Sequence, residues 1–403
     1  MGIAKADRKL MREINNMHVL QRVRVRGPVS RPELAEETGL GLSTISNIVT
    51  ELLADQLIRE VGEGDSSGGR RPSLLDINEA ARYAFGVKIG PERVWISLFD
   101  LRMHQVDTEQ LTFRPEESPK ILLSRVFAGM ERLRKKYRLA EQIVLGVGVS
   151  VSGLIDSERG ACLYSPILDW EDVPIQELLS QLSQLDVAVE NDVNTFAYGT
   201  LLQAVNAAVK NLICITTGPG VGAGIILDRC LYRGSHGGAG EFGHMSIDQH
   251  GPRCSCGRQG CLDVLASDQF LLARAKEVIG SGKSSRLKAM DLEGRLSPTT
   301  LFLAAESGDE AARSIYEELG RNLGCGVANL INLFDPEKIV IGGEGAAASK
   351  YFVDTVRDVA AKYAFPHLAD HVEIVVDDGA EDAWLQGAAA LIIEEFFKVP
   401  WSN

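Results

Sequence analysis

The sequence has no hydrophobic run long enough to cross a membrane. No stretch of its 403 residues approaches the roughly eighteen apolar residues of a spanning helix. The charged N-terminal segment MGIAKADRKLMREINN also lacks the apolar core of a signal peptide. We therefore expect a cytoplasmic protein that does not engage a membrane.

Cysteine is scarce and unevenly placed. Only seven are present, an odd number, and three of them fall in one short loop. This pattern argues against a disulfide framework and favours metal binding in a reducing compartment. The remaining four are expected to be small core residues: Cys162, Cys214, Cys230 and Cys325.

An excess of positive charge is also missing. The 42 Lys and Arg residues against 55 Asp and Glu residues give a net charge of −13, which argues against wholesale coating of nucleic acid. Residues 1 to 82 hold twelve basic and twelve acidic side chains, so the whole excess lies in the remainder. A neutral head on an acidic body is compatible with a local DNA reader.

Metal-ligand spacing is the strongest signal present. His244, Cys254, Cys256 and Cys261 lie within eighteen residues of a glycine-rich loop. A shell of one histidine and three cysteines predicts a structural Zn²⁺ site with no open coordination position. The second ring nitrogen of His244 then faces an oxygen acceptor, which we expect to be a ligand hydroxyl beside the carboxylate of Glu241. The alternative is a reduced cysteine cluster without metal.

Three short helical patterns occupy the N-terminal region. Residues 8 to about 26 form the first, a capping box at Ser30 to Glu33 begins the second, and residues 43 to 54 form the third. This order predicts a helix-turn-helix whose last helix enters the major groove of DNA. Its polar face carries the candidate DNA contacts Ser43, Thr44, Ser46 and Asn47. A plain helical packing module is the alternative.

A wing strand is expected at residues 57 to 62, so residues 1 to 66 form the winged domain. Residues 67 to 82 are predicted to be a linker that delivers Arg70 and Arg71 on a glycine tether. Paired arginines on such an arm suit a narrow, A/T-rich minor groove. A solvated linker is the alternative.

From Tyr83 the composition becomes α/β, with short apolar strands between helical patterns. Helices are expected at residues 193–207, 264–280, 299–333 and 381–397, the last packing back onto an earlier domain. The glycine-rich segment NLICITTGPGVGAGIILD runs from strand to strand. Because a dinucleotide fingerprint needs a helix after its glycines, a Rossmann site is excluded.

Two motifs resemble the ROK family of bacterial sugar repressors and sugar kinases. Glu241 to His244 matches the family's E-x-G-H sugar motif, and CSCGRQGC matches its zinc motif C-x-C-G-x-x-G-C. The N-terminal head and the SSGGRRP linker resemble the repressor branch of the family, because the kinases lack such a head. Within that branch, YSPILDWEDVPIQELL is similar to a segment of xylose repressors.

The resemblance implies a two-lobed sugar-kinase-like body of the actin/ribonuclease H-like ATPase fold. The first lobe would span residues 83–195 with the C-terminal helix 381–403. The second would span residues 196–380 and hold the zinc loop, the sugar site and an oligomerisation surface.

The resemblance also assigns sugar-binding roles to Asn191, Asp192, Glu241 and His244. Asp192 stands at the general-base position of the kinases and would be vestigial here. A helix N-cap at Asn191–Asp192 and a plain surface carboxylate at Glu241 are the alternatives. The resemblance gives Asp263 a sugar-binding role as well, although the family commonly has glutamate there and the shorter aspartate side chain would reach a ligand differently.

The first phosphate loop departs from the kinase pattern D-x-G-x-T. Here Lys88 replaces the carboxylate that organises magnesium, and Glu92 would repel nucleotide phosphates. We therefore expect no kinase activity. Glycine turns at Thr217 to Gly220 and at Gly342–Gly343 remain, as phosphate-loop remnants or as plain architecture.

These features together predict a sugar-responsive transcriptional repressor of a carbohydrate-utilisation operon, with xylose as the candidate sugar, that binds a palindromic operator as a homodimer or a tetramer. An ATP-dependent sugar kinase with an accessory head and a scaffold for another protein are the alternatives. The sequence specifies neither the sugar, the operator, residual nucleotide binding, nor whether the sugar induces or co-represses.

Overall fold

A computed structural model describes residues 8–64, 71–114, 117–281, 287–292, 294–377 and 379–398. The chain divides into two compact units, the first made of residues 1–190 and 388–403, the second of residues 191–387. Among the described residues, no helix combines the length and the apolar character needed to span a bilayer.

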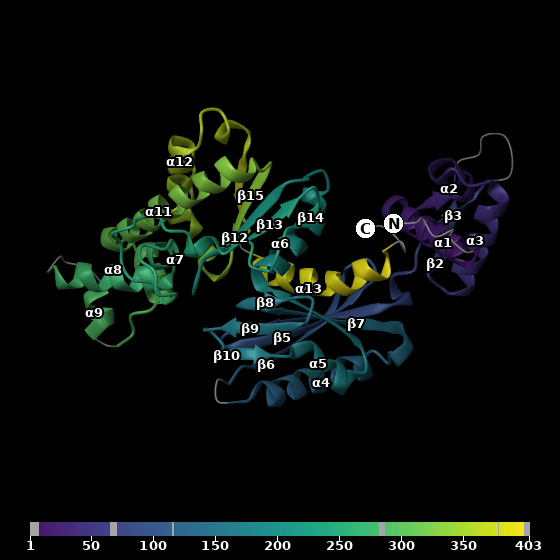
Figure 1. Cartoon of the computed structure of the whole chain (residues 1–403), viewed down its shortest axis with the longest axis horizontal. Helices are drawn as coiled ribbons and strands as arrows, with labels where there is room; N and C mark the ends of the chain where they lie inside the picture. The colour runs from purple at the N-terminus through teal and green to yellow at the C-terminus, as the bar shows by residue number, and fades with distance from the viewer. Residues whose placement is uncertain are drawn as a thin grey trace. The chain divides into compact units, whose positions relative to one another are not determined.

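The head within the first unit is built on three helices: α1 Arg8–Arg26, α2 Arg31–Thr38 and α3 Leu42–Ala54 (Figure 1). Helix α2 begins at the predicted capping box, where Ser30 and Glu33 satisfy each other's backbone N–H groups. It ends at Gly39, whose φ of 69° is left-handed. Fully buried side chains from all three helices form the head's core: Val19, Leu20, Leu34, Ile45 and Val49.

A three-stranded sheet completes the head, in the order β1-β3-β2. Its strands are β1 Val29–Ser30, β2 Ile58–Glu63 and β3 Ser73–Ile77. The predicted wing is therefore an antiparallel β2–β3 hairpin. The expectation of a linker throughout residues 67–82 does not hold at β3, because Leu75 and Ile77 point to the same face of this strand and are fully buried in the head.

The first lobe is a five-stranded sheet in the order β11-β7-β4-β5-β6. The strands are β4 Tyr83–Ile89, β5 Arg93–Asp100, β6 Gln105–Thr112, β7 Val144–Val151 and β11 Asp186–Asn191. Helices α4 Pro119–Lys136 and α5 Ile175–Ser183 lie together on one face (Figure 1). A small sheet is added by β8 Leu154–Asp156, β9 Ala161–Ser165 and β10 Trp170–Val173.

The second unit also has a five-stranded sheet, in the order β14-β13-β12-β15-β16. Its strands are β12 Leu212–Thr216, β13 Gly222–Leu227, β14 Cys230–Leu231, β15 Lys338–Gly342 and β16 Glu373–Val376. Its α-helices are α6 Asp192–Leu202, α7 Asp263–Ala266, α8 Asp268–Gly280, α9 Leu287–Leu292, α10 Pro298–Glu306, α11 Glu310–Phe334 and α12 Val353–Tyr363. Because β12 pairs directly with β13 in an antiparallel hairpin, the exclusion of a Rossmann site is confirmed.

Alternation along the strands gives this sheet two cores. Ile213, Ile215 and Ile341 pack with residues of α11 and α12. Leu212, Cys214 and Val340 point to the other face, where they meet Phe196 of α6 and Trp384. Cys214 is a core residue as expected, whereas Cys230 is exposed on β14, so that part of the cysteine prediction is wrong.

Helix α13, Ala380–Phe396, belongs to both units. In the second unit, a Cβ at Gly199 of α6 would collide with the carbonyl of Ala383, and one at Gly387 would collide with the carbonyl of Thr195. In the first unit, Gly148 of β7 lies equally close to Ala388. Glycine is thus required where α13 crosses α6 and β7.

Candidate functional site

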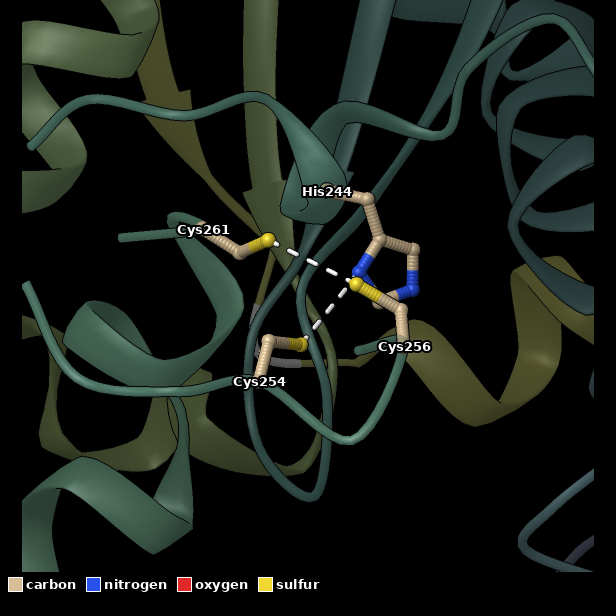
Figure 2. A group of neighbouring side chains, drawn as sticks. All are labelled: His244, Cys254, Cys256 and Cys261. Carbon is tan, nitrogen blue, oxygen red and sulfur yellow. Dashed lines mark hydrogen bonds between the residues drawn. The ribbon is translucent and has the colours of Figure 1, made fainter. Parts of the chain in front are cut away.

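The four predicted metal ligands converge on one point in the second unit (Figure 2). His244 ends the short 3-10 turn Phe242–His244, and the three cysteines come from the loop that leads into α7. Glycines shape this loop: Gly257 and Gly260 have φ of 86° and 66°, and the N–H of Cys254 donates to the carbonyl of Arg258 at 2.7 Å.

The ligand atoms lie within 4.8 Å of one another. The sulfurs of Cys256 and Cys261 are 3.6 Å apart, and that of Cys254 is 3.7 Å from Nδ1 of His244. Tetrahedral Zn²⁺ with Zn–S bonds of about 2.3 Å would set its ligands roughly 3.5 to 4 Å apart. The four ligand atoms are therefore close enough together to share one metal ion, and all seven cysteines are free of disulfides.

The thiols have different environments. Burial, followed by the neighbouring thiols, raises the pKa of Cys261 to about 12. The pKa of Cys256 lies below its ordinary value, chiefly because the backbone N–H of Arg258 donates to its sulfur. One thiol is thus enclosed in protein, while Cys256 is at the solvent side.

His244 lies between the cysteine cluster and Glu241, one of the predicted sugar residues. Its Nδ1 faces Cys254, while Nε2 lies 3.9 Å from the Oε2 atom of Glu241. The side chains of His244 and Glu241 are 34% and 54% exposed. A small hydroxyl-bearing molecule can therefore approach both groups from solvent.

Asn191 and Asp192 stand at the start of α6. The side chain of Asn191 accepts from the backbone N–H groups of Val193 and Asn194, at 2.8 and 3.2 Å. Asp192 also accepts from Val193 at 3.0 Å. The predicted helix N-cap is therefore confirmed at Asn191. These bonds hold the side chains of Asn191 and Asp192 at the start of the helix.

Strand β13 lies between the two sets of residues. Gly222 and Gly224 on β13 leave room for Val193, the residue after Asp192. On the other side, Gly240 and Gly243 lie against the backbone of residues 221–223. The start of α6 and the Glu241–His244 turn therefore border the same end of one strand.

Asp263 has a structural partner. Its Oδ1 atom accepts from the N–H of Val221 at 3.0 Å, which ties the start of α7 to the loop before β13. Asp263 therefore has a structural role in this loop, and its predicted sugar contact stays a prediction.

Two residues of the predicted phosphate loop, Lys88 and Gly90, lie against the side chain of Trp95. Lys88 is 4% exposed, and its Nζ lies 5.4 Å from the centroid of the Trp95 ring. A Cβ placed on Gly90 would be 3.2 Å from that ring. The sequence reasoning missed Trp95, whose position follows from the β4–β5 pairing opposite Lys88.

The other glycine turns, residues 217–220 and 342–345, bond to each other. Thr217 donates to the carbonyl of Gly342 through its N–H at 2.9 Å, and Gly345 donates to Thr217 at 2.8 Å. Two acidic residues missed from the sequence gather there. Burial, and then the charge of Glu344, raise the pKa of Asp268 to about 6.

The candidate DNA contacts lie on α3. Ser43 and Asn47 are exposed, whereas Thr44 and Ser46 are half-buried and Ser46 donates its hydroxyl to the carbonyl of Leu42. Arg71 is exposed and immediately precedes Pro72, whose carbonyl accepts from Gly64 of the wing hairpin. Arg70 lies outside the described residues.

Comparisons with known proteins agree over nearly the whole chain. The sequence profile of the ROK family matches residues 84–395. The chain is 31% identical to the xylose repressor of Caldicellulosiruptor bescii, over 97% of this chain and 98% of that protein. It is 28% identical to the Escherichia coli DNA-binding transcriptional dual regulator NagC, over 91% and 89%.

Solved structures give the same result. A ROK family transcriptional regulator homologous to the E. coli MLC protein matches with a TM-score of 0.83 at 29% identity, covering 96% of this chain and 97% of that one. A ROK family glucokinase from Streptomyces griseus, in complex with glucose and AMPPNP, matches with a TM-score of 0.68 at 28% identity, covering 77% and 99%.

Proposed function

The chain belongs to the ROK family, and on that premise we propose that it is a sugar-responsive transcriptional repressor. Its head binds operator DNA, and its body binds a sugar that changes the head's affinity for that DNA. The observation that carries this proposal is the match, head included, to regulators over nearly the full length of both chains.

Xylose is the first sugar to test, because the xylose repressor of C. bescii is similar along the whole chain. In the proposed site, the carboxylates of Glu241 and Asp192 accept hydrogen bonds from sugar hydroxyls, and the amide of Asn191 and Nε2 of His244 add further contacts. The opposite side of the His244 ring faces the metal cluster, so the metal sets the ring's orientation.

We assign Zn²⁺ to the cluster of His244, Cys254, Cys256 and Cys261. Three thiolates and one imidazole are the donor set that zinc prefers, and four protein ligands leave no position for water. The metal would supply structural rigidity rather than catalysis.

DNA binding is assigned to α3 and to the wing. Ser43 and Asn47 are the exposed polar residues of α3 among the candidates, and we propose that they reach base edges in the major groove. Arg71 and Arg70 would add contacts in an A/T-rich minor groove. The protein would act in the cytoplasm as a homodimer on a palindromic operator.

The kinase alternative is disfavoured by the first lobe. The ammonium of Lys88 stands where a kinase would organise magnesium, and the Trp95 ring packs over Gly90. The exposed carboxylate of Glu92 follows in the same turn. Three features thus oppose a bound Mg²⁺–triphosphate.

A paired experiment tests the proposal. Operator sequences are first selected from random DNA by the purified protein, and the affinity for them is then measured with and without each of a panel of sugars. A sugar that changes operator affinity supports the repressor. Sugar phosphorylation that depends on magnesium and ATP, at ordinary enzymatic rates, would instead establish a kinase.

A further inference from the structure

The C-terminal end of α13 contacts α1, the first helix of the head. The guanidinium of Arg24, on α1, lies over the ring of Phe397 at 4.1 Å from its centroid and forms an ion pair with Glu394 of α13. Beside it, Nε2 of Gln21 donates to the backbone carbonyl of Phe397 at 2.6 Å. We call Gln21, Arg24, Glu394 and Phe397 the latch.

The latch is partly shielded from water. The side chains of Arg24 and Glu394 are 20% and 31% exposed, and Phe397 is 1% exposed. A cation over an aromatic ring and an ion pair are both stronger when water is excluded. The contact is therefore more than two charges meeting at a free surface.

The other end of α13 packs on the helix that begins at the proposed sugar pair. Helix α6 starts at Asn191 and Asp192, and its Gly199 and Thr195 lie against Ala383 and Gly387 of α13 with no room for a methyl group. Backbones in such close contact move together, because no side chain can adjust between them. The same α13 continues unbroken to Phe396.

We propose that α13 carries the sugar signal to the head through the latch. A displacement of α6 by sugar at Asn191 and Asp192 would move α13, and α13 would release or reorient α1 through Arg24. This inference rests on the proposed function, since it specifies how that sugar site is coupled to DNA binding. The coupling is a difference in free energy between two head positions.

Neighbouring residues on α13 provide a matched test. Glu394 pairs with Arg24, whereas the adjacent Glu395 pairs with Lys398 at 3.4 Å. Glu394→Gln therefore weakens the latch, and Glu395→Gln removes the same charge without touching it. Hydrogen exchange of the α1 amides, measured without DNA or sugar, should accelerate about fivefold in Glu394→Gln and remain unchanged in Glu395→Gln.

The second measurement is the ratio of operator affinities without and with D-xylose, or with whichever sugar of the panel affects the wild type. The ratio should fall about fivefold in Glu394→Gln and in Phe397→Leu. The charge swap Arg24→Glu with Glu394→Arg should bring the ratio part of the way back toward the wild-type value. Should the wild type respond to sugar while Glu394→Gln keeps the full ratio, the latch is refuted and the repressor stands. If no sugar affects the wild type, the proposed function fails, and unchanged α1 exchange in Glu394→Gln refutes the latch independently.

Discussion

Nε2 of His244 lies 3.9 Å from the carboxylate of Glu241, on the side of the ring away from the cysteine sulfurs. In the proposed function, one side chain therefore serves both the metal site and the sugar site. The orientation of its solvent-facing nitrogen depends on what binds the other nitrogen. Loss of the metal should therefore weaken sugar binding.

Removing one metal ligand tests this dependence. Cys256→Ser is expected to lose the bound zinc, to lower the free energy of unfolding by about 3 kcal/mol, and to weaken sugar binding because His244 loses its anchor. Metal content by mass spectrometry and the melting temperature measure both effects. Cys230→Ser, which changes an exposed cysteine outside the cluster, should match the wild type. Unaltered zinc content in Cys256→Ser would remove the metal assignment.

The sugar contacts are tested by two isosteric changes. Glu241→Gln and Asp192→Asn should each weaken sugar binding by about 1.5 to 3 kcal/mol, because a charged acceptor of hydroxyl groups is lost. The shift in melting temperature at saturating sugar reports this loss. Glu317→Gln, an exposed residue of α11, serves as the control. Equal sugar-induced shifts in all three variants and the wild type would contradict the proposed site.

The DNA contacts make separable contributions. Asn47→Ala should cost about 1 to 3 kcal/mol on the selected operator and little on random DNA, because it removes a base contact. Changing Arg70 and Arg71 together to alanine should weaken binding to both DNAs and reduce the salt slope by about two. Titrations at several salt concentrations distinguish these effects, with Lys135→Ala on α4 as the control. A slope unchanged in the double arginine variant would exclude the arm from the interface.

Stability should depend on pH through Asp268, whose pKa is raised to about 6 by burial and by Glu344. Between about pH 4 and pH 6 the folded state holds a proton that the unfolded state has released, so this residue makes stability fall as pH rises through that window. Above it, the charged form costs about 1 to 2 kcal/mol once solvent screening is allowed for.

Asp268→Asn should therefore stabilise the protein at about pH 8, and the gain should shrink as the pH is lowered toward about 5. Urea unfolding of the variant and the wild type at both pH values measures it. Asp358→Asn, an exposed change on α12, should show no such trend. A gain that stays constant with pH would mean that the charge of Asp268 is not its cause.

The convergence of His244, Cys254, Cys256 and Cys261 could be predicted from the sequence because these residues lie close together along the chain, where spacing alone limits their geometry. The β12–β13 hairpin and the capping box at Ser30 were predictable for the same reason. Strand β3 was not, since the polar SSGGRR segment before it suggested a linker and only burial against the head identifies Leu75 and Ile77 as strand residues.

Contacts between distant segments were harder to predict. The partner of Asp263 is a backbone N–H at Val221, and backbone donors leave no trace in a motif. Asp268 and Glu344 come close because the two glycine turns form hydrogen bonds with each other. The sequence of neither turn indicates that the other turn is its partner. The latch joins residues that are 370 and 376 positions apart in the sequence, beyond the reach of any local pattern.

Helix α13 also determines when the protein can finish folding. Its residues fill space in both units: Ala383 and Trp384 in the second, and Ala388 and Ile393 in the first are almost fully buried. During synthesis, the cores of both units therefore stay incomplete until this helix has left the ribosome. A chain truncated ahead of Ala380 would expose apolar surface in both units at once.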